Sequence, residues 1–143
     1  SLSAIDHAVA FALQSLESIG AVHGKDERFA LSLVLRELLT NAYYHGSRDD
    51  ASLIGLSIEA YVASGPLRIQ TFDESENFDP QAVLQDITGK NGLRERKRGL
   101  MLLDMLCDSL LAEPGRVEVR FTPGRHNIDG RRDDAVQSKR RHT

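Results

Sequence analysis

The sequence predicts an α+β protein, a two-layer α/β sandwich in which helices cover one face of a mixed, mostly antiparallel sheet. The first observation behind this prediction is the order of the hydrophobic patterns: helix, helix, strand, strand, a segment without a pattern, helix, strand, strand. The second is size, because 143 residues with 41% hydrophobic side chains suffice for one domain with an ordinary core. We therefore expect about four strands in one sheet.

Two helices are expected at the start of the chain. Ser3 followed by Asp6 is similar to a capping box, which predicts a first helix over residues 4–19. A second, longer helix is expected to begin at residues 25–26, after a loop bounded by glycines. Gly46 is a typical C-terminal helix stop, so this second helix is predicted to end beside it.

The second helix carries the polar pair that bears most on function, Glu37 and Asn41. Residues four apart share one helix face, and at about 100° per residue this pair falls where the apolar and polar sectors meet. The apolar sector contains Leu31, Val34, Leu35, Leu38, Leu39 and Ala42. Burying a carboxylate without partners is unfavourable. We therefore expect a metal ion, a phosphate-bearing ligand or a local hydrogen-bond network at this pair.

The four strands are predicted to form two hairpins. Residues 53–62 and 67–72 are separated by a Ser-Gly-Pro turn at 64–66. Residues 109–112 and 116–121 are separated by Glu-Pro-Gly, which is typical of a closing hairpin.

Between the two hairpins the pattern changes twice. A short helix is expected over 79–87, where Asp-Pro can open it. Residues 88–98, TGKNGLRERKR, carry five basic side chains and one apolar one, which predicts a mobile loop. Residues 99–107 are again helical and very apolar, so core packing is expected there, including the only cysteine, Cys107.

Charge and composition narrow the classes of function. The net charge is -3, but the basic tail over 123–143 contributes +3 from six basic and three acidic side chains, which leaves -6 for residues 1–122. An acidic body argues against nucleic acid as the main partner. We expect the tail to be disordered. No apolar run is long enough to span a membrane, no signal-peptide pattern is present, and a single cysteine fits a cytoplasmic protein.

Three segments carry a family resemblance. ELLTNAYYHG (37–46), IQTFDESENFDP (69–80) and KRGLMLLDML (97–106) resemble, in order and spacing, the three nucleotide-binding motifs of the GHKL ATPase superfamily. The sequence is most similar to the small anti-sigma-factor serine kinases of the RsbW and SpoIIAB type. The resemblance covers roughly residues 30–121 and implies a Bergerat-type ATP-binding fold for a histidine-kinase-like ATPase domain over 1–122.

The resemblance implies a role for each of five matching residues, with ATP and magnesium as cofactors. Glu37 would be the general base that activates the attacking hydroxyl, and Asn41 would bind the magnesium that bridges the ATP phosphates. Asp73 would accept a hydrogen bond from the adenine amino group. Gly99, at a helix start, would let the backbone approach the phosphates, and Arg98 would belong to a basic lid over them.

Four further residues complete the implied nucleotide-binding set: His45, Ser75, Leu100 and Met101. From the residues alone, His45 is interpreted as a helix C-terminal residue favoured by the helix dipole rather than as a catalyst. Ser75, Asn77 and Met101 stand where the motifs of the resembled family usually carry glycine.

The implied function is an ATP- and magnesium-dependent serine/threonine protein kinase in partner switching. It would bind a sigma factor or another client, phosphorylate an antagonist protein with a STAS domain, and form a homodimer through the outer region of the sheet. The absent motif glycines favour a different function, that of a degenerate, non-catalytic protein-binding module of the same fold. The sequence is also compatible with a regulatory domain cut from a larger signalling protein and with the ATPase domain of a sensor histidine kinase.

Overall fold

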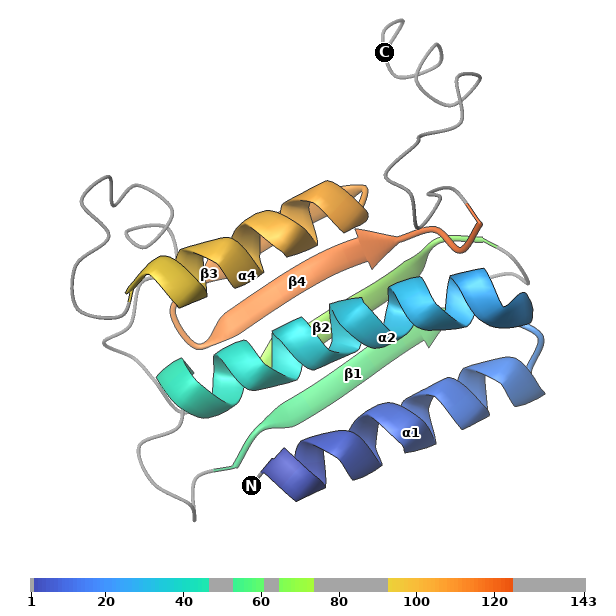
Figure 1. The fold of residues 1–143 in the computed structure, drawn as a ribbon, viewed down its shortest axis with the longest axis horizontal. Helices are drawn as coiled ribbons and strands as arrows, with labels where there is room; N and C mark the ends of the chain where they lie inside the picture. Colours follow the sequence, from blue (N-terminus) through green and yellow to red (C-terminus); the bar gives the residue numbers. More distant parts are fainter. Residues whose placement is uncertain (1, 47–52, 61–64, 74–92, 125–143) are drawn as a thin grey trace, which may run out of the picture.

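Three helices lie on one face of a four-stranded sheet in the computed structural model, which describes residues 2–46, 53–60, 65–73 and 93–124 (Figure 1). In chain order the elements are α1 (Leu2–Ser18), α2 (Gly24–Asn41), the π-helical turn η1 (Ala42–Gly46), β1 (Gly55–Ala60), β2 (Leu67–Phe72), α4 (Leu93–Leu106), β3 (Ser109–Glu113) and β4 (Arg116–Phe121). The predicted α+β sandwich with helices on one face is confirmed. The predicted helix over 79–87 and the tail from residue 125 onward lie outside the described residues.

The sheet has the strand order β1-β2-β4-β3, and all three pairings are antiparallel. Both predicted hairpins are present, and β2 has the predicted bounds. A mixed, mostly antiparallel sheet was expected, and among the described strands every pairing is antiparallel, including that of β2 with β4, which joins the two hairpins. The register places Ile58 opposite Ile69 and Ile69 opposite Val119, so apolar side chains of neighbouring strands share the face beneath the helices.

Two predicted helix starts differ from the structure. Helix α1 begins at Leu2, so Ser3 lies inside the first turn and the capping-box interpretation is wrong. Helix α4 begins at Leu93, so residues 93–98, predicted as loop, are helical. The reason is intrinsic propensity, since leucine, arginine, glutamate and lysine are strong helix formers even in a segment with few apolar residues.

Helix α2 is the centre of the core. Every member of its predicted apolar sector is buried, and Leu31, Val34, Leu35 and Leu38 are fully inaccessible to solvent. This row packs on the sheet side chains Leu67, Ile69, Val117, Val119 and Phe121 within one continuous hydrophobic core. The packing holds α2 firmly over the strands, and with it the polar residues at its edge.

Two smaller expectations can be compared with the structure. Cys107 is buried in the core, as expected, and desolvation together with the nearby Asp108 and Asp104 raises the pKa of its thiol to about 12. Such a thiol is neutral at physiological pH and packs as a small apolar group. Among the described helices, none has the length and apolar character needed to cross a membrane.

Candidate functional site

The ends of three elements meet at one end of the molecule, where the candidate site lies. The C-terminal end of α2, the C-terminal end of β2 and the N-terminal end of α4 point to the same side in Figure 1. Asp73 follows β2 directly, and its backbone N–H donates a 3.0 Å hydrogen bond to the carbonyl oxygen of Gly115 in the β3–β4 turn. The strand end that carries Asp73 is therefore held in place by the neighbouring hairpin.

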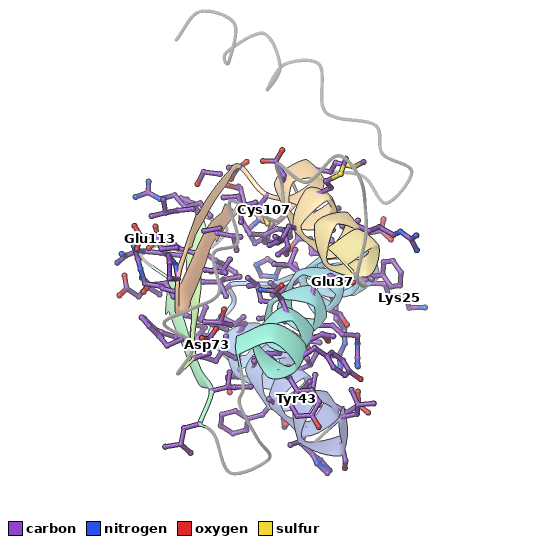
Figure 2. All side chains as sticks on the ribbon, turned by 90° about the vertical axis from the view of Figure 1, so that its left-hand side faces the viewer. Lys25, Glu37, Tyr43, Asp73, Cys107 and Glu113 are labelled. Carbon is purple, nitrogen blue, oxygen red and sulfur yellow. The ribbon has the colours of Figure 1, made fainter. Side chains whose placement is uncertain are left out.

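Glu37 lies where α2 meets α4 (Figure 2). Its side chain is half-buried, and the carboxylate faces the backbone of α4 at Gly99. A Cβ atom placed on Gly99 would be 2.7 Å from Oε2 of Glu37, which shows how closely the two helices approach there. Burial raises the pKa of the Glu37 carboxyl above its ordinary value of 4.5. A carboxylate with a raised pKa is a stronger base than an ordinary one.

The local hydrogen-bond network considered for Glu37 and Asn41 does not form within the described part of the chain. Neither side chain makes a hydrogen bond or an ion pair with another described residue. Asn41 is the last residue of α2 and is also half-buried. Glu37 lies one helical turn before Asn41, so both polar side chains are near the C-terminal end of α2.

The raised pKa of Glu37 predicts that the difference in unfolding free energy between the wild type and Glu37→Gln changes with pH. Because the folded-state pKa exceeds the unfolded value, this carboxyl favours folding most below about pH 4.5, and that contribution is lost as pH rises through the folded pKa. Glu37→Gln removes the titrating group. We measure the unfolding free energies of both proteins by urea titration. We expect the value for the variant to rise relative to that of the wild type as pH rises above 4.5, and the difference then to become constant. If the variant does not become more stable relative to the wild type as pH rises above 4.5, the carboxylate is not buried as described.

The π-helical turn η1 extends α2 and was not predicted. The N–H of Ala42 donates to the carbonyls of both Leu38 and Leu39 at the point where the hydrogen-bond pattern changes. Tyr43 packs partly on the core and Tyr44 is exposed, with their rings in a T-shaped arrangement 5.0 Å apart. Single π-turns occur frequently at functional sites. No local sequence signal distinguishes such a turn from the last turn of an α-helix.

Thr71 is a buried polar residue of β2 that was not predicted as part of the site. It is 2% exposed, and it faces the helices from β2 between Leu56 and Val117. It precedes Asp73 by two residues, a spacing that keeps side chains on one face of an extended chain. The alternation of β2 contained this signal, because an inward position was occupied by threonine instead of an aliphatic residue.

The remaining predicted residues fall into three groups. Gly99 lies in the second turn of α4, so the prediction that it stands at a helix start is wrong. Leu100 is 1% exposed and belongs to the core, whereas Arg98 and Met101 are exposed on α4. The backbone of His45 lies in η1, but its side chain lies outside the described residues, and so does Ser75.

Asn41 is the residue at this end of the molecule whose chemistry suits a magnesium ion. In the described ranges no three His, Cys, Asp or Glu side chains gather into a metal-binding group. Magnesium is commonly bound through one or two protein oxygens together with phosphate and water oxygens. The Asn41 side-chain carbonyl provides one such oxygen at the end of α2.

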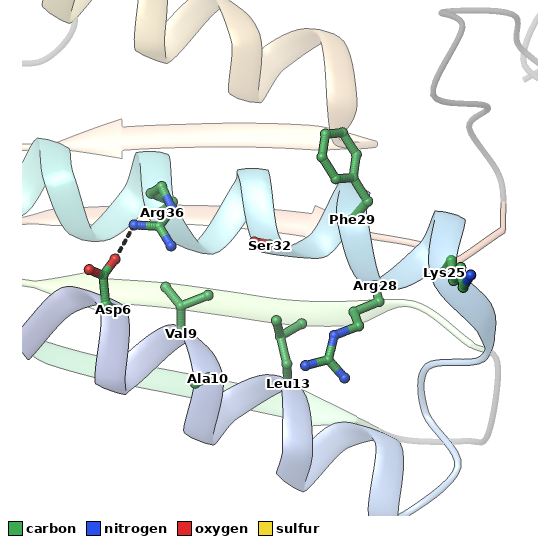
Figure 3. A pocket seen from close by; sticks show the side chains of 9 residues that line it. All are labelled: Asp6, Val9, Ala10, Leu13, Lys25, Arg28, Phe29, Ser32 and Arg36. Atoms are coloured by element: carbon green, nitrogen blue, oxygen red, sulfur yellow. Dashed lines mark hydrogen bonds and ion pairs between the residues drawn. The ribbon is translucent and has the colours of Figure 1, made fainter.

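A separate groove of about 370 Å³ lies between α1 and α2 (Figure 3). Its walls are Asp6, Val9, Ala10 and Leu13 of α1, and Lys25, Arg28, Phe29, Ser32 and Arg36 of α2. An ion pair between Arg36 and Asp6 joins the two helices across it, and Arg28 pairs with Glu17. None of the motif residues lines this groove, so it is distinct from the candidate site.

The chain belongs to the family of histidine kinase-like ATPase domains, whose model matches residues 2–122. The match includes every described helix and strand. Among solved structures, the chain is similar to the histidine kinase domain of a blue-light activated histidine kinase from Erythrobacter litoralis EL346. The identity is 16% and the TM-score 0.44, over 82% of this chain and 64% of that one. The chain thus spans less than two thirds of the length of that domain. No curated protein matches the sequence.

Proposed function

We propose that this domain is an ATP- and magnesium-dependent serine/threonine protein kinase that acts in partner switching. The observation that carries the proposal is the Glu37 carboxylate, which is half-buried, has a raised pKa and forms no hydrogen bond within the described residues. It stands one helical turn before Asn41 in a domain of the histidine kinase-like ATPase family. A desolvated carboxylate beside a cation-binding oxygen is suited to accept a proton from a hydroxyl.

The proposed roles divide the site by chemistry. Asn41 would hold magnesium through its amide oxygen, and the bound cation would neutralise phosphate charge. Glu37 would accept the proton of a serine or threonine hydroxyl as that oxygen attacks the γ-phosphorus, while the bond to the β-phosphate oxygen breaks and ADP leaves. Asp73, held at the end of β2 by its bond to Gly115, would accept a hydrogen bond from the adenine amino group.

The proposed reaction requires the protein to position and stabilise the reacting groups rather than to form a covalent bond with the substrate. Phosphoryl transfer is catalysed mainly by positioning and electrostatic stabilisation. Helix α2 is anchored in the core by four fully buried side chains, so the groups on its edge are held in a fixed orientation. Arg98, exposed on α4 near the same end, is a candidate cation for the transferred phosphate.

The proposed partners follow from the resemblance to anti-sigma-factor kinases. The protein acceptor would be an antagonist with a STAS domain, and the client would be a sigma factor or a similar regulator. A homodimer through the outer face of the sheet is part of this proposal. That face carries an ion-pair network, in which Arg68 contacts Glu118 at 2.5 Å and Arg116 contacts Glu113 at 3.0 Å. No described helix covers it (Figure 2).

A transfer assay tests the proposed function. The protein is incubated with γ-labelled ATP and magnesium together with purified STAS-domain proteins of the source organism. We expect label on a serine or threonine of one of them, and no transfer when EDTA replaces magnesium. ATP binding without transfer to any of these proteins would contradict the kinase assignment and favour a non-catalytic, protein-binding module.

A further inference from the structure

Gly99 occupies a position where its backbone does not require glycine. It lies in the second turn of α4 with neighbours in helical conformation. It is not one of the described glycines with positive φ, which are Gly20, Gly24, Gly115 and Gly124. Glycine inside a helix lowers stability relative to alanine because it loses more backbone freedom on folding. Backbone conformation therefore does not explain glycine at this position.

The space beside Gly99 is filled by one side chain. A Cβ atom at this position would approach Oε2 of Glu37 to 2.7 Å and its Cδ to 3.7 Å. Beyond its chain neighbours and its own helix, no other atom of the described residues would come within 4 Å. A separation below 3.0 Å forces one of the two atoms to move, and the free end of the Glu37 side chain moves more easily than a helix backbone.

We propose that Gly99 is a positioning residue for Glu37, and that the missing side chain at position 99 is the slot that holds the Glu37 carboxylate against α4. The catalytic consequence rests on the proposed function, whereas the slot itself does not. The raised pKa of Glu37 accords with the slot, because the close backbone of α4 excludes water from one side of the carboxylate. In this arrangement α4 sets the position of the proposed base.

The slot predicts a specific fault in Gly99→Ala. The added methyl group displaces the carboxylate, while the backbone of α4 gains a better helix former. The protein is expected to remain folded. Displacing a catalytic group by about 1 Å can lower the rate by about 10²-fold, so the fault should appear in phosphoryl transfer.

A thermal double-mutant cycle tests the slot without reference to activity. It compares the full chain with Gly99→Ala, Glu37→Ala and the double variant. In the Glu37→Ala background, where the slot is empty, alanine at position 99 should raise the unfolding midpoint by about 2–4 °C. In the Glu37 background the midpoint should rise less or fall. Equal rises in both backgrounds would overturn the proposal. Glu37→Asp provides a second background, because its carboxylate is one methylene group further from α4.

Measurements of phosphoryl transfer and ATP affinity distinguish a positioning role of Gly99 from a direct role in nucleotide binding. For Gly99→Ala we expect phosphoryl transfer to fall by about 10-fold or more while ATP affinity changes less than about 3-fold. Asp104→Ala, on the exposed side of α4, is the matched control and should leave both unchanged. A loss of ATP affinity with normal transfer at saturating ATP would overturn the proposal. If the wild type transfers no phosphate, the proposed function fails, and the thermal cycle still decides the role of Gly99.

Discussion

Replacing Glu37 with glutamine is expected to lower the rate of phosphoryl transfer by about 10²- to 10⁴-fold. Glutamine keeps the length of the side chain and fits the same space beside Gly99, but it cannot accept the hydroxyl proton. ATP affinity should change little, because the carboxylate acts on the attacking hydroxyl rather than on the nucleotide. Single-turnover transfer at saturating ATP, together with a separate ATP titration, measures the two effects independently.

The control for this variant is Glu17→Gln. Glu17 is an exposed carboxylate on α1 that pairs with Arg28, and it belongs neither to the candidate site nor to the proposed dimer face. This control should transfer phosphate at the wild-type rate. Transfer by Glu37→Gln within about 3-fold of the wild type would exclude Glu37 as the general base, since a positioned base contributes far more than that.

Leu35→Ala is expected to destabilise the fold by about 2–5 kcal/mol. Leu35 is fully buried in the row of α2 side chains that packs on the sheet, so its removal leaves a cavity at the centre of the core. Domains of this size are stable by about 5–15 kcal/mol in total, so a large part of the stability is lost. Urea denaturation followed by far-ultraviolet circular dichroism measures the change.

The control for the core is Phe11→Ala, which removes a larger side chain from the surface. Phe11 is 73% exposed on α1, so its truncation should change the unfolding free energy by no more than about 0.5 kcal/mol. A Leu35→Ala variant as stable as Phe11→Ala would show that α2 is not the centre of the core.

Much of the fold could be predicted because the spacing of apolar residues along the sequence indicates which side chains are buried. The apolar sector of α2 and the alternation in β2 and β4 identify the residues that fill the core. The Ser-Gly-Pro and Glu-Pro-Gly turns separate the strands of each hairpin. A hairpin fixes the direction of its own two strands, but the direction of β2 relative to β4 depends on how the hairpins associate. For that reason the sequence does not distinguish a mixed sheet from the fully antiparallel one.

The start of α4 shows where burial is a poor guide to secondary structure. Residues 93–98 carry only one apolar side chain, a pattern that predicts a loop. The first turns of a helix can form without many apolar side chains when their residues favour helix and an apolar helical segment follows. The residues of α4 before Leu100 meet both conditions. The same error places Gly99 at a helix start and conceals its contact with Glu37.

The polar pair at the candidate site can be located from the sequence, but its surroundings cannot. Four-residue spacing places Glu37 and Asn41 together at the edge of an apolar sector. The closeness of α4 to Glu37 and the burial of Thr71 arise from contacts between elements far apart in the chain. Local periodicity contains no information on such contacts.

The most direct test of a nucleotide site at Glu37 and Asn41 is isothermal titration of ATP into the full chain, with magnesium and then with EDTA. We expect magnesium-dependent binding in the micromolar range, a free energy of about -8 kcal/mol. The Asn41→Ala variant should lose the dependence on magnesium, because the proposed oxygen ligand is absent. Failure of the wild type to bind at millimolar ATP in the presence of magnesium would contradict a nucleotide site at these two residues.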